Sequence, residues 1–201
     1  MRIVALDIAT RCGIAIGTAG EKPVAYSVDL GRGKSEDHRF SACLSLVSKL
    51  LAEHKPGLLA IEAPVGGRET SHYLVGLVAC ARGVAMNRGV RVETVTSAAA
   101  RKHFIGHVPA VRDFPGMTKD KAKIEIKRIV QARCRALGWD HDDLDGCDAL
   151  AIWDFSAATW GRSQAAPLGG LFRGACAAPA SPSRKERTRQ RGNAPGQTAN
   201  T

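Results

Sequence analysis

The hydrophobic pattern near the start of the chain predicts a buried strand that ends in an acid. Residues 3–6 form an uninterrupted apolar run, and Asp7 follows directly. A continuous apolar run of this length is typical of a strand covered on both faces. Asp7 is therefore expected to be nearly buried, where a carboxylate needs a cation, hydrogen-bond donors or a metal ion beside it. Taken alone, Asp7 could equally cap a turn.

Turn residues after Asp7 predict that the chain continues as an antiparallel meander. The segment 9–13 has the composition of a turn, and 14–17 is apolar and returns as a second strand. A third strand is expected at 23–28, at the spacing of a hairpin.

A helix and a second buried strand follow, and this strand also ends in an acid. Ser35 is placed to cap an amphipathic helix that ends near His54. The apolar run 58–61 follows and ends in Glu62. A right-handed crossover through the helix makes this strand parallel to the first. If the two strands are neighbours, Asp7 and Glu62 meet at the same end of the sheet.

The last helix carries the second unusual pair of acids. Asp145, Asp148, Ala149 and Ile152 fall at positions i, i+3, i+4 and i+7, so both acids lie on the stripe that the helix buries. Asp142 and Asp143 are more simply interpreted as capping this helix or favouring its dipole. The elements expected between Glu62 and this helix are a helix at 69–87, a strand at 91–95, a short helix capped by Thr96 or Ser97, a loop at 106–116 and a basic helix at 118–136.

Composition places a globular domain before a basic tail. The 201 residues are 44% hydrophobic and carry a formal net charge of +10, which favours a polyanionic partner. Residues 162–201 hold seven Lys or Arg against one Glu, and they are rich in Gly, Pro, Ala and Ser without periodicity. We therefore expect a domain at 1–161 and a low-complexity basic tail at 162–201 that is disordered.

Cysteine usage and hydropathy indicate a cytoplasmic protein. The six cysteines form no C-x-x-C pair and sit largely among apolar residues, as expected of reduced, packed side chains. No window reaches the length of a membrane span, and no secretory leader is recognisable.

Four acids, Asp7, Glu62, Asp145 and Asp148, are the candidates for a common centre. Like charges brought close together require counter-charge, and an all-oxygen cluster suits a hard cation, Mg²⁺ or Mn²⁺. Two such ions could activate water and stabilise the leaving oxygen in phosphodiester hydrolysis. The alternative is four unrelated acids paired with the plentiful Lys and Arg.

The sequence resembles the RuvC-like Holliday junction resolvases of the ribonuclease H-like superfamily. The resemblance rests on IVALDIATRCG at 3–13, AIEAP at 60–64, ARGVA at 81–85 and DGCDALAI at 145–152, in the family's order. The segments AARK at 99–102 and GMTKDKAKI at 116–124 also look like the family's. The match covers about residues 2–158.

This resemblance implies an α/β fold and assigns roles to particular residues. It implies a mixed five-stranded sheet, three antiparallel strands followed by parallel ones, flanked by helices. The acids Asp7, Glu62, Asp145 and Asp148 would be the catalytic metal ligands for two Mg²⁺ ions, with Mn²⁺ an alternative, and Lys121 the lysine near the metal site. It also implies a homodimer on branched DNA, with the helix at 69–87 as the interface; that helix could instead simply pack closely on its own sheet. The candidates for DNA-backbone contacts are Arg11, Arg68, Arg101, Lys102, Lys119, Lys121 and Lys123.

One departure from the family concerns how a junction is opened. Bacterial members place an aromatic residue shortly after the Glu, whereas here no aromatic occurs until Tyr73. The sequence leaves three other functions to compare: a YqgF-like nuclease acting on structured RNA, a non-catalytic module that binds branched DNA, and an actin-like or sugar-kinase ATPase. The last needs a second similar domain, for which this chain has no room.

Overall fold

The computed structural model describes residues 1–64, 71–139 and 141–161. All of them fall within one compact unit, Met1–Ala165. The predictions for the tail at 162–201 and for Arg68 lie outside the described residues.

A mixed five-stranded sheet forms the centre of the domain, as expected. Its spatial order is β3-β2-β1-β4-β5. The first three strands pair antiparallel, and β4 and β5 continue the sheet in parallel on the other side of β1. The strands are β1 (Arg2–Asp7), β2 (Arg11–Thr18), β3 (Val24–Asp29), β4 (Leu58–Glu62) and β5 (Arg91–Val95).

Three of the five described α-helices begin with a side-chain cap, close to the starts predicted from the sequence. Ser35, Thr96 and Thr118 each accept a hydrogen bond from a backbone N–H in the first turn of the helix that follows. Asp143 stands at the N-cap position of the last helix, but its side chain makes no capping bond. The helices are α1 (Glu36–His54), α2 (His72–Asn87), α3 (Ser97–Ile105), α4 (Lys119–Ala136) and α5 (Leu144–Trp160); a 3-10 turn, η1 (Val111–Asp113), lies within the expected loop.

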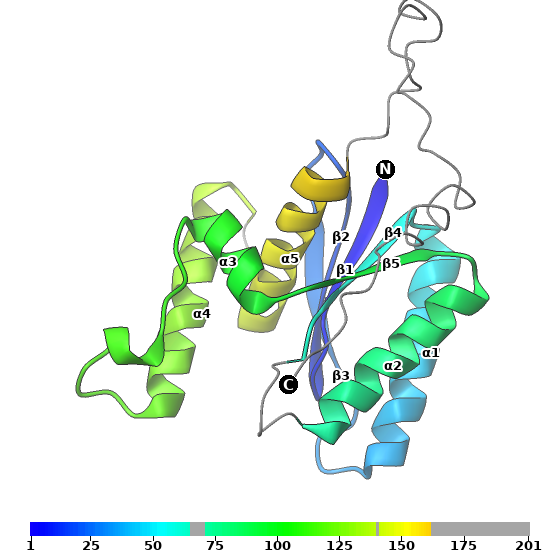
Figure 1. The fold of residues 1–201 in the computed structure, drawn as a ribbon, viewed down its shortest axis with the longest axis horizontal. Coiled ribbons are helices and arrows are strands. Elements are labelled where there is room, and N and C mark those ends of the chain that lie inside the picture. Colours follow the sequence, from blue (N-terminus) through cyan, green and yellow to red (C-terminus); the bar gives the residue numbers. More distant parts are fainter. Residues whose placement is uncertain (65–70, 140, 162–201) are drawn as a thin grey trace, which may run out of the picture. The chain divides into compact units, whose positions relative to one another are not determined.

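The helices cover the two faces of the sheet unequally. Figure 1 shows α1 and α2 on one face and α5, with α3 and α4 beyond it, on the other. Each face has its own apolar cluster, and Leu150, Ile152 and Trp153 of α5 lie deep in the second. Because α5 is enclosed by the sheet and by α3 and α4, it is buried around most of its circumference. Asp148 is one of only two polar residues buried in the described part of the chain, the other being Ser156.

The cysteines agree with the sequence interpretation as far as the structure describes them. Cys12, Cys43, Cys80, Cys134 and Cys147 are all free thiols, and four of the five are buried. Cys176 lies outside the described residues. Among the described helices, none combines the length and the apolar character required to span a bilayer.

Candidate active site

The two parallel central strands deliver the first pair of acids. Leu6 of β1 pairs with Ile61 of β4, so Asp7 and Glu62, the next residues, emerge together at the same edge of the sheet. Both side chains border one hollow of about 120 Å³. The predicted proximity of these two acids thus follows from strand register alone.

The start of α5 brings the second pair of acids to the same edge. Gly13 of β2 pairs with Asp7, and α5 lies so close to it that a Cβ at Gly13 would overlap the backbone carbonyl of Asp145. Asp148 lies one turn further along the helix, with a side chain only 8% exposed, whereas the side chain of Asp145 is 25% exposed. The close approach permitted by Gly13 therefore sets the distance between β1 and these acids.

A lysine that the sequence analysis did not single out lies at the centre of the acids. The Lys127 Nζ on α4 lies 2.5 Å from Asp145 Oδ1, 3.0 Å from Asp148 Oδ2 and 3.9 Å from Asp7 Oδ2. This one ammonium group therefore joins β1 to both acids of α5.

Burial and neighbouring charges together raise the pKa of both Asp7 and Lys127. Burial, followed by the adjacent Glu62 carboxyl and by Asp148, raises the pKa of Asp7 well above its ordinary value, although Lys127 opposes this shift. Burial lowers the pKa of Lys127, but the carboxylates of Asp148, Asp7 and Asp145 outweigh it and raise that pKa overall. Lys127 is consequently a permanent cation at neutral pH.

Two arginines predicted to contact DNA are held by the acids in this structure. Arg11 lies 3.3 Å from Asp143 Oδ1 and 3.4 Å from Asp145 Oδ2. Arg101 Nη2 lies 3.5 Å from Asp148 Oδ1, on the side away from Lys127. Both side chains retain some exposure, 46% for Arg11 and 22% for Arg101.

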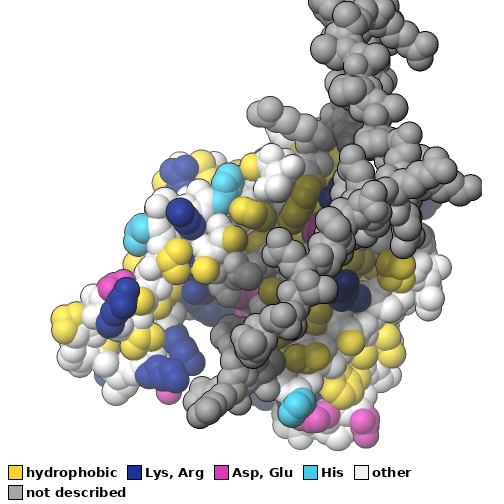
Figure 2. Space-filling view, in the orientation of Figure 1, with side chains coloured by type: hydrophobic (Ala, Val, Ile, Leu, Met, Phe, Trp, Pro, Cys, Tyr) yellow, Lys and Arg dark blue, Asp and Glu magenta, His cyan; other side chains and the backbone are white. Residues whose placement is uncertain are grey.

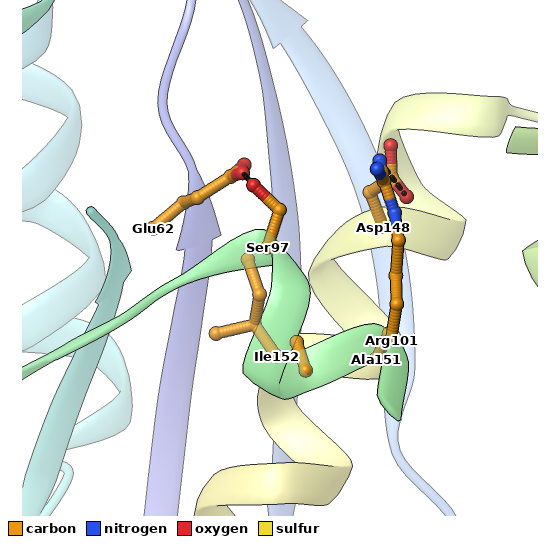
Figure 3. Close-up of a pocket in the computed structure, with 7 residues that line it drawn as sticks. Glu62, Ser97, Arg101, Asp148, Ala151 and Ile152 are labelled. Atoms are coloured by element: carbon orange, nitrogen blue, oxygen red, sulfur yellow. Dashed lines mark hydrogen bonds and ion pairs between the residues drawn. The ribbon is translucent and has the colours of Figure 1, made fainter. Parts of the chain in front are cut away.

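Glu62 has a hydroxyl partner from the start of α3. Figure 3 shows the Ser97 side chain pointing at Glu62, with Arg101 and Asp148 paired on the other side of the same small cavity. The Ser97 Oγ donates a hydrogen bond to Glu62 Oε1. The sequence indicated Ser97 only as a possible helix cap, a role that Thr96 takes.

The remaining basic candidates lie on the surface and not among the acids. Lys102, Lys119, Lys121 and Lys123 are exposed, and Figure 2 shows Lys and Arg side chains gathered over the α3 and α4 part of the molecule. Lys121 borders a separate hollow with Met117, Ile124 and Arg128. Lys127 is six positions after Lys121, which places it about 9 Å further along the helix and on a face about 120° away. The lysine that contacts the acids is thus Lys127, and a catalytic role for Lys121 stays a prediction.

Tyr73, the first aromatic after Glu62, is held in place by its neighbours. Its ring lies 5.8 Å from Phe40 and 4.4 Å from the Arg39 guanidinium carbon, and its hydroxyl is 3.4 Å from Thr10 Oγ1. Tyr73 is therefore packed against α1 and the β1–β2 turn and is not a freely projecting side chain.

The donor chemistry of the cluster fits a hard cation. Within the described ranges, no three His, Cys, Asp or Glu side chains are grouped so as to hold a metal ion as they stand. Asp7, Asp145 and Asp148 instead surround the Lys127 ammonium, which is itself a cation bound by carboxylate oxygens. Oxygen ligands of this kind suit Mg²⁺ or Mn²⁺, so the residues present fit the expected ions.

This α/β domain, with its strand order and its acids at the ends of β1 and β4 and at the start of α5, has a fold similar to that of RuvC. The chain matches Thermus thermophilus RuvC with a TM-score of 0.57 and 18% identity, covering 78% of this chain and 93% of that one. It matches the same RuvC in complex with a Holliday junction substrate with a TM-score of 0.58 and 18% identity, over 78% of this chain and 92% of that one.

A more distant structural match is the yeast mitochondrial Holliday junction resolvase Ydc2. The TM-score is 0.47 with 9% identity, over 78% of this chain and 79% of that one. No protein-family model matches the sequence, and no curated protein matches it. The two matches to Thermus RuvC confirm, at the level of the fold, the resemblance inferred from motifs.

Proposed function

We propose that this chain is a divalent-metal-dependent endonuclease that resolves Holliday junctions or other branched DNA. The observation that carries the proposal is the meeting of Asp7, Glu62, Asp145 and Asp148 at one edge of a RuvC-type sheet. Withdrawing four acids from water reduces folding stability even when cationic side chains pair with them, so their presence together favours a functional role. A module that only binds DNA would have no need of them.

In this function each group around the centre has a distinct task. Mg²⁺ or Mn²⁺ held within this cluster of acids would supply an activated water and stabilise the charge on the leaving oxygen. Ser97 orients the Glu62 carboxylate. Lys127 holds the carboxylates of β1 and α5 together. Arg11 and Arg101 are partly exposed at the rim, where they can turn from the acids to DNA phosphates.

The exposed lysines and α2 provide the surfaces that branched DNA and a second subunit require. Lys102, Lys119, Lys121 and Lys123 are placed to contact the sugar-phosphate backbone without reading sequence. On α2, Val75 is 42% and Met86 71% exposed, and a Cβ at Gly83 would meet no other atom, whereas Gly76 packs tightly on Phe40. The open part of α2 supports a homodimer, which would place two centres on symmetric strands. The free cysteines support a cytoplasmic location.

The test is Mg²⁺-dependent cleavage of a four-way junction by the wild-type chain and by Asp7→Asn and Asp148→Asn. We expect both variants to bind the junction as wild type does and to cut it at least 100-fold more slowly, in line with the loss of a charge-stabilising group. Cleavage at the wild-type rate by both would refute the proposal. Cleavage of structured RNA in preference to the junction would favour the YqgF-like function instead.

A further inference from the structure

The Lys127 ammonium lies where a cation bound to the acids of β1 and α5 would lie. It is within 4.0 Å of Asp7, Asp145 and Asp148 at once. The neighbouring positions Ile126 and Val130 are buried, which fixes this face of α4 against the domain. The Lys127 side chain is only 29% exposed. The packing of α4 therefore fixes the base of the Lys127 side chain beside the acids, and its three ion pairs hold the ammonium among them.

The Glu62 side of the cluster is different, because it has open space. Asp7 and Glu62 border a hollow of about 120 Å³ whose other walls are mostly apolar, including Leu74 and Val78 of α2. This is room for several water molecules. Mg²⁺ keeps several of its waters when it binds to proteins, so this hollow suits one hydrated ion between two carboxylates.

The charge around the centre also fits one divalent ion. The acids that contact one another or share a cation are Asp7, Glu62, Asp143, Asp145 and Asp148, and the cations paired with them are Lys127, Arg101 and Arg11. Five carboxylates against three cations leave a net charge of −2 once Asp7, whose pKa is raised in this cluster, gives up its proton to bind an ion. One divalent ion neutralises this charge, whereas two would leave an equal excess of positive charge.

We propose that the Lys127 ammonium takes the place of one of the two divalent ions expected from the family resemblance. The centre then binds a single divalent ion, on the Asp7 and Glu62 side, and Lys127 is the fixed counter-ion of Asp145 and Asp148. This inference rests on the proposed nuclease function and gives its metal requirement.

The experiment counts Mn²⁺ ions bound to the full chain without DNA, by calorimetry and by electron paramagnetic resonance. Wild type is expected to bind one ion per chain with the spectrum of isolated Mn²⁺. Lys127→Met keeps the length and apolar stem of the side chain but removes its charge, and it should bind two ions. Two ions about 4 Å apart are spin-coupled and give a distinct spectrum. Arg128→Met, on the exposed side of α4, is the matched control and should bind one ion, as wild type does.

Each outcome separates this inference from the proposed function. Two ions on the wild-type chain would overturn the role of Lys127, even if the junction is cut. One ion on both wild type and Lys127→Met would overturn it as well. The wild-type count needs no variant, so the inference stays testable if Lys127→Met does not fold. One ion on wild type and two on the variant, without junction cleavage, would support the inference and refute the nuclease.

Discussion

Replacing Gly13 by Ala should separate the acids of the candidate site without removing any of them. A Cβ at Gly13 would lie 2.6 Å from the carbonyl carbon of Asp145 and closer still to its oxygen. Carbon atoms pack at about 3.5–4.0 Å, so the start of α5 must move by about 1 Å. Overpacking of this kind costs about 1–3 kcal/mol of folding stability. A displacement of about 1 Å at a catalytic centre can cost about 100-fold in rate.

The assay combines urea unfolding with cleavage of a four-way junction. We expect Gly13→Ala to lower the free energy of unfolding by about 1–3 kcal/mol and the cleavage rate by about 100-fold. The control for the unfolding measurement is Gly83→Ala on α2, whose Cβ would have no neighbour within 4 Å in its own chain. In a helix interior this change should raise stability by about 0.5–1 kcal/mol. A Gly13→Ala variant as stable and as active as wild type would show that α5 does not set the geometry of the site.

Two further predictions concern carboxylates that accept hydrogen bonds from nearby groups. Ser97→Ala removes the hydroxyl that donates a hydrogen bond to Glu62, and it should raise the Mg²⁺ concentration for half-maximal cleavage by about 10- to 100-fold. The control Ser45→Ala on α1 should leave this concentration unchanged. An unaltered Mg²⁺ titration of Ser97→Ala would contradict an orienting role for Ser97. Asp29 accepts hydrogen bonds from the backbone N–H groups of Gly31 and Arg32 at 2.7 Å, and these lower its pKa. A group whose pKa is lowered by folding stabilises the folded state fully above its unfolded pKa of about 3.9. This stabilisation is lost as the pH falls through the pKa of the folded state. Asp29→Ala should therefore be less stable than wild type in urea at pH 7, and the difference should shrink as the pH is lowered below about 4; a difference independent of pH would exclude this explanation.

The parts of the site predicted from sequence are those fixed by local pattern. The apolar run before Asp7 predicts a central strand, and the parallel crossover predicts that Glu62 meets it. The spacing of Asp145 and Asp148 on α5 predicts that both acids face inward. Each of these inferences needs only a periodicity and a handedness rule, so one sequence is enough.

Contacts between elements that are far apart in sequence could not be predicted in this way. Lys127 lies beside the buried stripe of α4, a position where lysines often remain in solvent, and only the packing of α4 on α5 brings it to the acids. The family pattern pointed to Lys121, which lies on a different face of the same helix. Asp143 has the sequence position of a helix cap, but its carboxylate forms an ion pair with Arg11 of β2 and makes no capping hydrogen bond. Ion pairs of this kind depend on relative placement, which periodicity does not encode.

The order in which the chain is synthesised bears on when the centre can exist. Asp7 belongs to the first strand made, but its partners on α5 are among the last described residues to leave the ribosome. β1 also lies in the middle of the sheet, between β2 and β4, so its pairing is complete only after β4 has been made. Domains generally fold as units during synthesis. A nascent chain that has not yet extruded residue 148 therefore lacks part of the acid cluster. Under the proposed function, such a chain would not yet cleave nucleic acid near the translating ribosome.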